Sequence, residues 1–155
     1  MPIELTETDA AILRIVRADA RTTIENIAHR VGLSASAAQR RLQRLRDEKV
    51  ILGEVAVLDP KLVGNPVTML VELELERDRP ELLPGFHQWI ANAPEVQQAW
   101  YVTGRGDYTL VIVSPSIESF DALMERLVSE NRNIRKFTTS VVLKTLKRGL
   151  AVPVG

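Results

Sequence analysis

The sequence predicts an α+β protein of two domains, a helical domain followed by a domain of order strand, helix, strand, strand, helix, strand. Apolar residues recur at helical spacing of three and four over residues 6–47. From residue 67 onwards they alternate with a period of two along several short segments. A connector rich in turn residues separates the two patterns. The predicted divisions are residues 1–52, a connector at 53–65, a second domain at 66–150 and a tail at 151–155.

Residues that commonly cap helices predict three helices in the first domain. Thr6 and Thr23 are placed to cap the first two helices, and Ser34 or Ser36 to cap the third. Gly32 ends the second helix, because glycine readily adopts the left-handed conformation. The second and third helices are then joined by a very short turn, which is the helix-turn-helix arrangement.

The connector and the second domain are predicted to supply the strands. Val55–Leu58 reads as a short connector strand. The second domain is expected to place strands at 67–76, 96–103, 109–113 and 137–146, and helices around 82–90 and 120–127. This order is the ferredoxin-like split βαβ plan, a four-stranded antiparallel sheet with two helices on one face.

That plan leaves one face of the sheet without cover. Leu110 and Ile112 would lie on one side of their strand, and Val111 and Val113 on the other. A strand that is apolar on both sides calls for cover on both faces. We therefore expect a second copy of the chain on the open face, which makes the protein a homodimer.

Composition excludes several classes of function. The 155 residues include no cysteine, which excludes disulfides, thiolate catalysis and Cys-ligated zinc. No signal-peptide pattern and no apolar run of about 20 residues is present, so a cytoplasmic protein without a membrane partner is expected. His29 and His87 lie far apart and are expected at the surface rather than on a metal. No metal or cofactor is predicted.

The third helix carries the candidate nucleic-acid surface. Spacings of three and four place five polar residues on the side away from the core, namely Ser36, Gln39, Arg40, Gln43 and Arg44. Arginine can bond the edge of guanine with two hydrogen bonds, and glutamine does the same for adenine. Phosphate contacts are predicted for Arg41, Thr22 and Thr23, with Ser34 also counted as a DNA contact. The alternative is an ordinary solvated basic face.

A glycine-containing turn is the second candidate site. It consists of Thr103, Gly104, Arg105, Gly106, Asp107 and Tyr108. Glycines allow backbone amides to approach a carboxylate closely, as an amino-acid ligand would require. Arg105 could bind that carboxylate and Asp107 could provide a further charged partner. The alternative is a plain hairpin turn.

Six short motifs, in register along nearly the whole chain, resemble the Lrp/AsnC family, also called feast/famine regulators. They are Leu5 with Asp9-Ala10-Ala11-Ile12-Leu13; Arg30-Val31-Gly32-Leu33-Ser34; Arg40-Arg41-Leu42 with Leu45; Val50-Ile51 with Gly53; Val102-Thr103-Gly104 with Asp107-Tyr108; and Val142-Leu143-Lys144. The chain departs from the family pattern at Gly106, where an aromatic residue is usual, and at Phe137, where a threonine is frequent.

The resemblance implies a winged helix-turn-helix domain, an effector domain, dimers assembling into octamers, and amino acids as effectors. It also implies that Thr139 lies near the effector. We therefore predict a sequence-specific transcriptional regulator that binds double-stranded DNA and whose assembly or DNA affinity responds to a small effector. A nucleoid-organising protein with little effector response is one alternative. A small ligand-processing enzyme is another, against which the lack of paired catalytic carboxylates, cysteine or an acid–base histidine counts.

Overall fold

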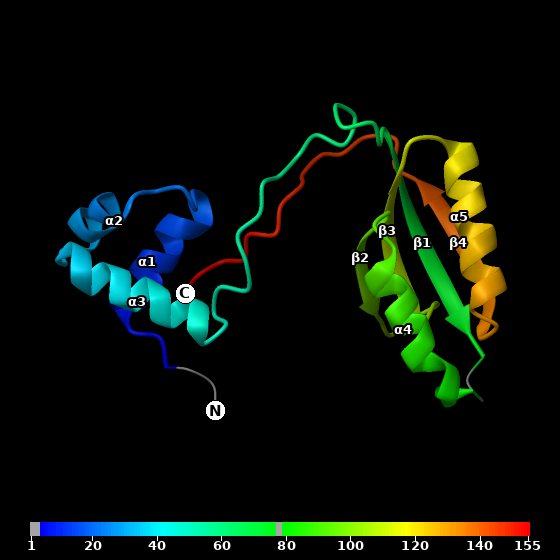
Figure 1. Cartoon of the computed structure of the whole chain (residues 1–155), viewed down its shortest axis with the longest axis horizontal. Helices are drawn as coiled ribbons and strands as arrows, with labels where there is room; N and C mark the ends of the chain where they lie inside the picture. Colours follow the sequence, from blue (N-terminus) through cyan, green and yellow to red (C-terminus); the bar gives the residue numbers. More distant parts are fainter. Residues whose placement is uncertain (1–3, 77–78) are drawn as a thin grey trace. The chain divides into compact units, whose positions relative to one another are not determined.

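The computed structural model describes residues 4–76 and 79–155 and shows two compact units. One unit covers the chain up to Ala56 together with Lys147–Gly155, and the other covers Val57–Leu146. Residues 1–3 and 77–78, which the predicted domains include, lie outside the described residues. The predicted α+β organisation, helices first and then a mixed unit, is confirmed (Figure 1).

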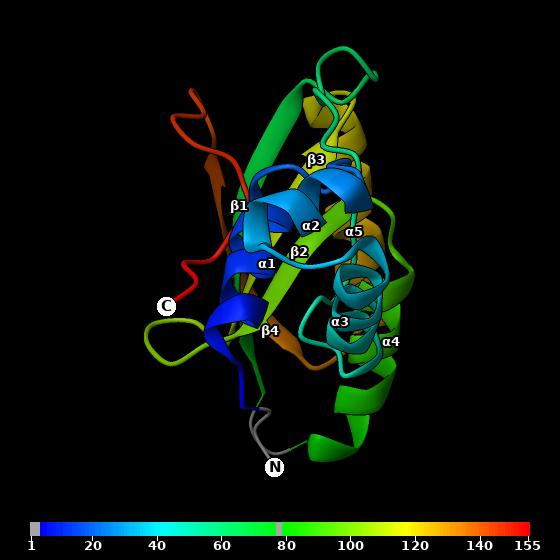
Figure 2. The ribbon, with the colours of Figure 1, turned by 90° about the vertical axis from the view of Figure 1, so that its left-hand side faces the viewer.

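The first unit is built from the helices α1 (Glu7–Ala18), α2 (Ile24–Val31) and α3 (Ala35–Asp47) (Figure 2). Each predicted cap is present, and Ser34 rather than Ser36 caps α3. Gly32 ends α2 in the left-handed conformation with φ of 69°. The helices enclose a small apolar core of Ile12, Leu13, Ile15, Ile27, Ala28, Ala38, Leu42 and Leu45.

The C-terminal residues complete this first unit. Val154 packs against its apolar core. The Arg17 guanidinium donates to the carbonyl oxygen of Val152 at 2.9 Å, and that of Arg14 donates to the main-chain oxygen of Gly155 at 2.7 Å. The chain thus passes from one unit to the other twice. Residues 147–150, predicted to end the second domain, belong to the first unit.

The second unit is an antiparallel sheet of order β2-β3-β1-β4 with α4 and α5 on one face (Figure 1). Its elements are β1 (Val67–Leu75), the short helix η1 (Pro80–Leu82), α4 (Leu83–Asn92), β2 (Val96–Tyr101), β3 (Tyr108–Ser114), α5 (Ile117–Glu130) and β4 (Ile134–Val141). Alternate residues of β1 and β3 face the helices, and the core between sheet and helices includes Val71, Leu73, Phe86, Leu110, Ile112, Leu123 and Leu127. This is the predicted ferredoxin-like arrangement.

Two predicted strands are corrected by the structure. Val55–Leu58 form no strand and are exposed, because no other described segment forms backbone hydrogen bonds with them. Among the described residues the first unit therefore contains helices but no strand, and no β-wing. The last strand begins at Ile134 and ends at Val141 instead of covering residues 137–146. Its limits follow its partner, since β1 pairs with β4 only between Leu75↔Ile134 and Met69↔Val141.

Within the second unit, no described residue covers the sheet face opposite the helices. Leu70 and Trp100 lie on it with 42% and 47% of their surfaces exposed, beside the half-buried Val111 and Val113. Exposed apolar side chains therefore cluster on one side of an otherwise well-packed unit. In the described residues no helix is both long and apolar enough to cross a lipid bilayer.

Candidate nucleic-acid interface and effector site

The outer side of α3 is exposed as the sequence predicts. Successive helical residues are rotated by about 100°, so positions three and four apart share a side. Ala38, Leu42 and Leu45 are buried in the first unit. The opposite side presents polar side chains to solvent: Ser36, Gln39, Arg40 and Gln43. The short turn after Gly32 fixes this helix against α2, which gives the exposed side a defined orientation within the unit.

Arg41 and Arg44 also lie on α3, but both are bonded to a carboxylate of α1. Arg44 Nη2 lies 2.8 Å from Asp9 Oδ2, and Arg41 Nη1 lies 3.0 Å from Asp9 Oδ1. Asp9 itself is completely buried. The two arginine side chains remain 36% and 42% exposed, so neither is enclosed by its contact with Asp9. Arg44, predicted to read bases, therefore has a structural partner that the sequence prediction did not include.

Asp9 is held as an ionised carboxylate by the hydrogen bonds and charges around it. It forms a capping box with Thr6, whose backbone N–H and hydroxyl donate to Asp9 Oδ2 at 3.0 and 2.7 Å. Burial raises the pKa of Asp9, but the hydrogen bonds from Thr6 and Arg41 and the charge of Arg44 together outweigh it, so its pKa lies below the ordinary value. The residue joins the start of α1 to the middle of α3.

Other predicted DNA contacts also have hydrogen bonds within the protein. The Thr22 hydroxyl donates to the Asp19 carbonyl at 2.8 Å. The hydroxyl oxygens of Thr23 and Ser34 accept the N–H groups of residues 26 and 37 as helix caps. Gln43 Nε2 donates to Asp47 Oδ1 at 2.8 Å. These bonds fix the helix ends and the outer side of α3. Each of these hydroxyl and amide groups can still form a further hydrogen bond on its solvent side.

The glycine-containing turn between β2 and β3 is tied to the end of β1. The Asp107 N–H donates to the Leu73 carbonyl at 2.8 Å, and Asp107 Oδ2 accepts the Leu75 N–H at 2.8 Å. Gly106 passes so close that a Cβ there would lie 3.2 Å from the Leu73 carbonyl oxygen. Gly104 has φ of 137°, a conformation that favours glycine. Glycine therefore suits both positions, Gly104 for its backbone conformation and Gly106 for its close approach to β1.

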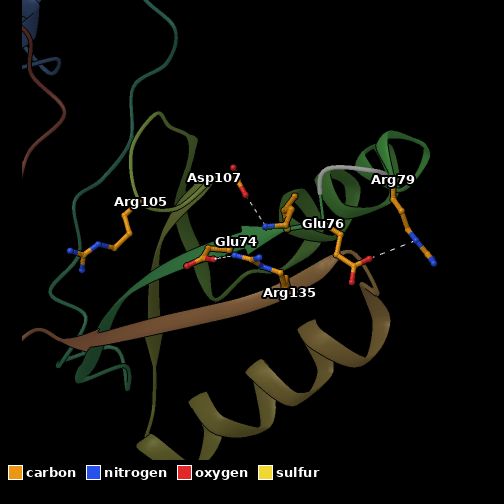
Figure 3. Close-up of a pocket in the computed structure, with 7 residues that line it drawn as sticks. Glu74, Glu76, Arg79, Arg105, Asp107 and Arg135 are labelled. Carbon is orange, nitrogen blue, oxygen red and sulfur yellow. Dashed lines mark hydrogen bonds and ion pairs between the residues drawn. The ribbon is translucent and has the colours of Figure 1, made fainter.

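A charged cleft of about 740 Å³ opens beside this turn (Figure 3). Its lining is Glu74, Leu75, Glu76, Arg79, Arg105, Asp107 and Arg135. Arg135 donates to Glu74, which lowers the pKa of the Glu74 carboxyl and raises the pKa of the guanidinium. Arg79 lies 3.7 Å from Glu76. Arg105 extends away from these pairs (Figure 3) and forms no ion pair with another described residue.

The structure brings only part of the predicted effector set to the cleft. Arg105 and Asp107 line it, whereas Thr103 and Gly104 are exposed in the turn. Tyr108 instead faces the helices, where its hydroxyl lies 2.7 Å from Nε2 of the exposed His87. Burial, Tyr101 and Asp107 raise the pKa of Tyr108.

Thr139 pairs with Val71 in the sheet and therefore lies on the same side as Tyr108. Its hydroxyl oxygen is buried and has no hydrogen-bond partner among the described residues.

The sequence prediction missed Glu74, Glu76, Arg79 and Arg135. The sequence feature that could have revealed this cleft is the run of acidic residues at the end of β1. Such a run predicts a charged end to a sheet whose other positions are apolar.

Comparison with known proteins agrees with this architecture along the whole chain. The AsnC-type helix-turn-helix domain matches residues 5–46, and the Lrp/AsnC ligand binding domain matches residues 68–152. The chain is 41% identical to an uncharacterized HTH-type transcriptional regulator, y4tD, of Sinorhizobium fredii, over 98% of this chain and 90% of the relative. An AsnC family transcriptional regulator from Agrobacterium tumefaciens superposes with a TM-score of 0.88 at 30% identity, covering 96% of this chain and 97% of that one. A transcriptional regulator from Neisseria meningitidis, solved as a complex with L-methionine, superposes with a TM-score of 0.89 at 25% identity, covering 97% of both chains.

Proposed function

Because the chain belongs to the Lrp/AsnC family of transcriptional regulators, we propose that α3 reads specific sequences in double-stranded DNA and that an amino-acid effector changes assembly or DNA affinity. The DNA-binding part of this proposal rests on one observation, the exposed polar side of α3 in a helix-turn-helix unit. Such a helix fits the major groove, where base edges distinguish all four base pairs. A DNA-binding regulator of this kind would act in the cytoplasm.

Side chains on α3 and at the starts of α2 and α3 make different kinds of DNA contact. Gln39, Arg40 and Gln43, with Ser36, have the chemistry to reach base edges. Thr22, Thr23 and Ser34 lie at the starts of helices or in the turn before them, where hydroxyls and backbone N–H groups bind phosphate. Contacts of the second kind set the register of the protein on the duplex but carry no sequence information.

The effector-binding part of the proposal rests on the cleft beside the β2–β3 turn. An amino acid offers one carboxylate and one ammonium group. The cleft presents Arg105 for the first and, for the second, the carboxylates of Glu74 and Glu76, which Arg135 and Arg79 also contact. The Neisseria relative was solved with an amino acid, L-methionine. The uncharged residues of the predicted effector set then surround the ligand without binding its charged groups: Thr103, Gly104, Gly106, Tyr108 and Thr139.

The open sheet face supports a homodimer. Leu70, Trp100, Val111 and Val113 form an apolar patch there that the chain does not cover. A second copy would bury it through a two-fold interface. The dimer presents two copies of α3, so half-sites about one helical turn apart are expected on DNA. Further assembly to an octamer is the state that the family resemblance implies.

The decisive experiment is selection of bound genomic fragments with and without a panel of amino acids. A regulator enriches a small set of fragments that share a motif, and one amino acid shifts the recovered amount of them. Coupling of about 1–3 kcal/mol is typical of such effects and acts equally on effector and DNA affinity. Enrichment of no motif would instead indicate a nucleoid-organising protein. A motif that responds to no amino acid would reject the effector-binding part alone.

A further inference from the structure

The contact between Asp9 and the two arginines limits what Arg41 and Arg44 can do at a DNA surface. Asp9 is fully buried, and its two oxygens receive Arg44 Nη2 at 2.8 Å and Arg41 Nη1 at 3.0 Å. Charge-assisted hydrogen bonds of this length are about twice as strong as neutral ones. A guanidinium has five N–H donors, so the groups not used by Asp9 remain free to point outward.

These arginines also share a hollow on the surface of the first unit. Together with Arg40, Leu33 and Ala37 they line a depression of about 380 Å³. A rotation of about 100° per residue puts Arg41 and Arg44 on the flank of α3 that faces α1, while Gln39 and Gln43 lie on the other flank. The lining contains three cations and no acid. A hollow of this chemistry fits a tetrahedral oxyanion, and on DNA that group is a backbone phosphate.

We propose that buried Asp9 is a positioning residue that sets Arg41 and Arg44 as a clamp for one DNA phosphate, and that neither arginine reads a base. The inference rests on the proposed function and refines it. An arginine that reads guanine must direct two N–H groups of its fork at one base edge, whereas here Arg41 Nη1 and Arg44 Nη2 are already held by Asp9. A phosphate accepts hydrogen bonds from many directions and can be bound by the donors that remain. Base readout then rests on Ser36, Gln39, Arg40 and Gln43.

The clamp makes a prediction that runs against simple electrostatics. Removal of an acidic charge near a DNA-binding surface normally strengthens binding to the polyanion. If Asp9 positions the arginines, Asp9→Asn weakens binding instead, on specific and random duplexes alike. The matched control is Glu7→Gln, which removes an acidic charge from the same turn of α1 but at a side chain that is 83% exposed and paired with Arg14. This control should bind as tightly as the wild type or more tightly.

The test uses the full chain and fluorescence anisotropy, with duplexes first selected by the wild type from a randomised library and with random duplexes. Arg44→Ala should lower the affinity for both by the same factor and reduce the slope of log K against log salt by about one. Selection repeated with Arg44→Ala should return the wild-type motif. Arg40→Ala, in contrast, should lower the ratio of specific to random affinity by about tenfold.

Each outcome decides the proposal. It is overturned if Arg44→Ala changes the selected motif or leaves the salt slope unaltered, or if folded Asp9→Asn binds as tightly as the wild type. Circular dichroism at the assay temperature checks the fold. Should Asp9→Asn not fold, the salt slope and the repeated selection with Arg44→Ala still decide. Wild-type protein that binds no duplex even at low salt would reject the proposed function itself, a result distinct from failure of the clamp.

Discussion

Asp107 bonds the main chain of β1 on both sides of Glu74: its carboxylate accepts the Leu75 N–H at 2.8 Å, and its own N–H donates to the Leu73 carbonyl at 2.8 Å. The side chain of Glu74, the residue between these two partners, lines the charged cleft. Asp107 therefore fixes the β2–β3 turn to the end of β1, beside the proposed effector site. The oxygen that Asp107 commits to Leu75 holds the turn against the end of β1.

Asp107→Ala should destabilise the second unit. The change leaves the N–H of the buried Leu75 without its acceptor, which costs about 1–3 kcal/mol of unfolding free energy. Denaturant unfolding followed by the fluorescence of Trp89 and Trp100 measures this, because both tryptophans belong to the second unit. Arg105→Ala is the matched control in the same turn and should stay within about 0.5 kcal/mol of the wild type. Equal losses in the two variants would show that Asp107 has no special role.

Arg105→Ala should act on the effector instead. If this guanidinium binds the ligand carboxylate, its removal costs about 1.5–3 kcal/mol of binding free energy. Calorimetric titration with the amino acid identified in the fragment selection measures the loss. Arg148→Ala, an exposed arginine that does not line the cleft, is the control. Unchanged affinity in Arg105→Ala would place the effector elsewhere.

Asp9 should make the first unit sensitive to acid. Its pKa in the folded protein lies below the ordinary value of 3.8, so its contribution is complete above that pH and is lost as the pH falls through the lowered pKa. Amide hydrogen exchange in α1 and α3 follows this unit, which contains no Trp, Tyr or Phe that fluorescence could report. The wild type should be more stable than Asp9→Asn by about 1–3 kcal/mol at neutral pH. The difference should shrink below pH 3.8; a constant difference down to the most acidic pH would contradict the ionised carboxylate.

Features that depend on near neighbours in the chain could be predicted from the sequence, and features that depend on distant partners could not. The caps Thr6, Thr23 and Ser34 act on backbone groups three residues away, so local patterns reveal them. From its neighbours in the sequence, Asp9 is predicted only to be an acidic residue that favours the start of a helix. Its bond to Arg44 joins residues 35 positions apart and becomes visible only in the folded unit.

The same distinction explains the errors in the strands and in the cleft. Val55–Leu58 alternate as a strand does, but alternation supplies no partner, and no described segment pairs with them. Glu74 and Arg135 lie 61 residues apart and meet because β1 pairs with β4. The sequence showed the turn at Asp107 but not the charged residues that the sheet register brings to it.

Val154→Asp should destabilise the first unit. Val154 packs against the core of the three helices, and a charge placed there must be desolvated or must pull the C-terminal segment away. A loss of about 1–3 kcal/mol is expected in hydrogen exchange of α1. Val152→Asp is the matched control, since that side chain is 69% exposed and only its carbonyl bonds Arg17. Equal effects of both changes would mean that the segment is not part of the unit in solution.

Leu70→Glu should weaken the proposed homodimer. Leu70 lies on the open face of β1 opposite Val111, and a carboxylate there would be buried against its own copy across a two-fold axis. Loss of about 2 kcal/mol or more is typical when a central apolar contact is disrupted. Sedimentation equilibrium of the full chain measures the shift towards monomer. Val128→Glu, the same change on the exposed side of α5, should leave the association constant unaltered. If both variants remain dimers, the second copy binds through a different surface, and the spacing expected for the DNA half-sites loses its basis.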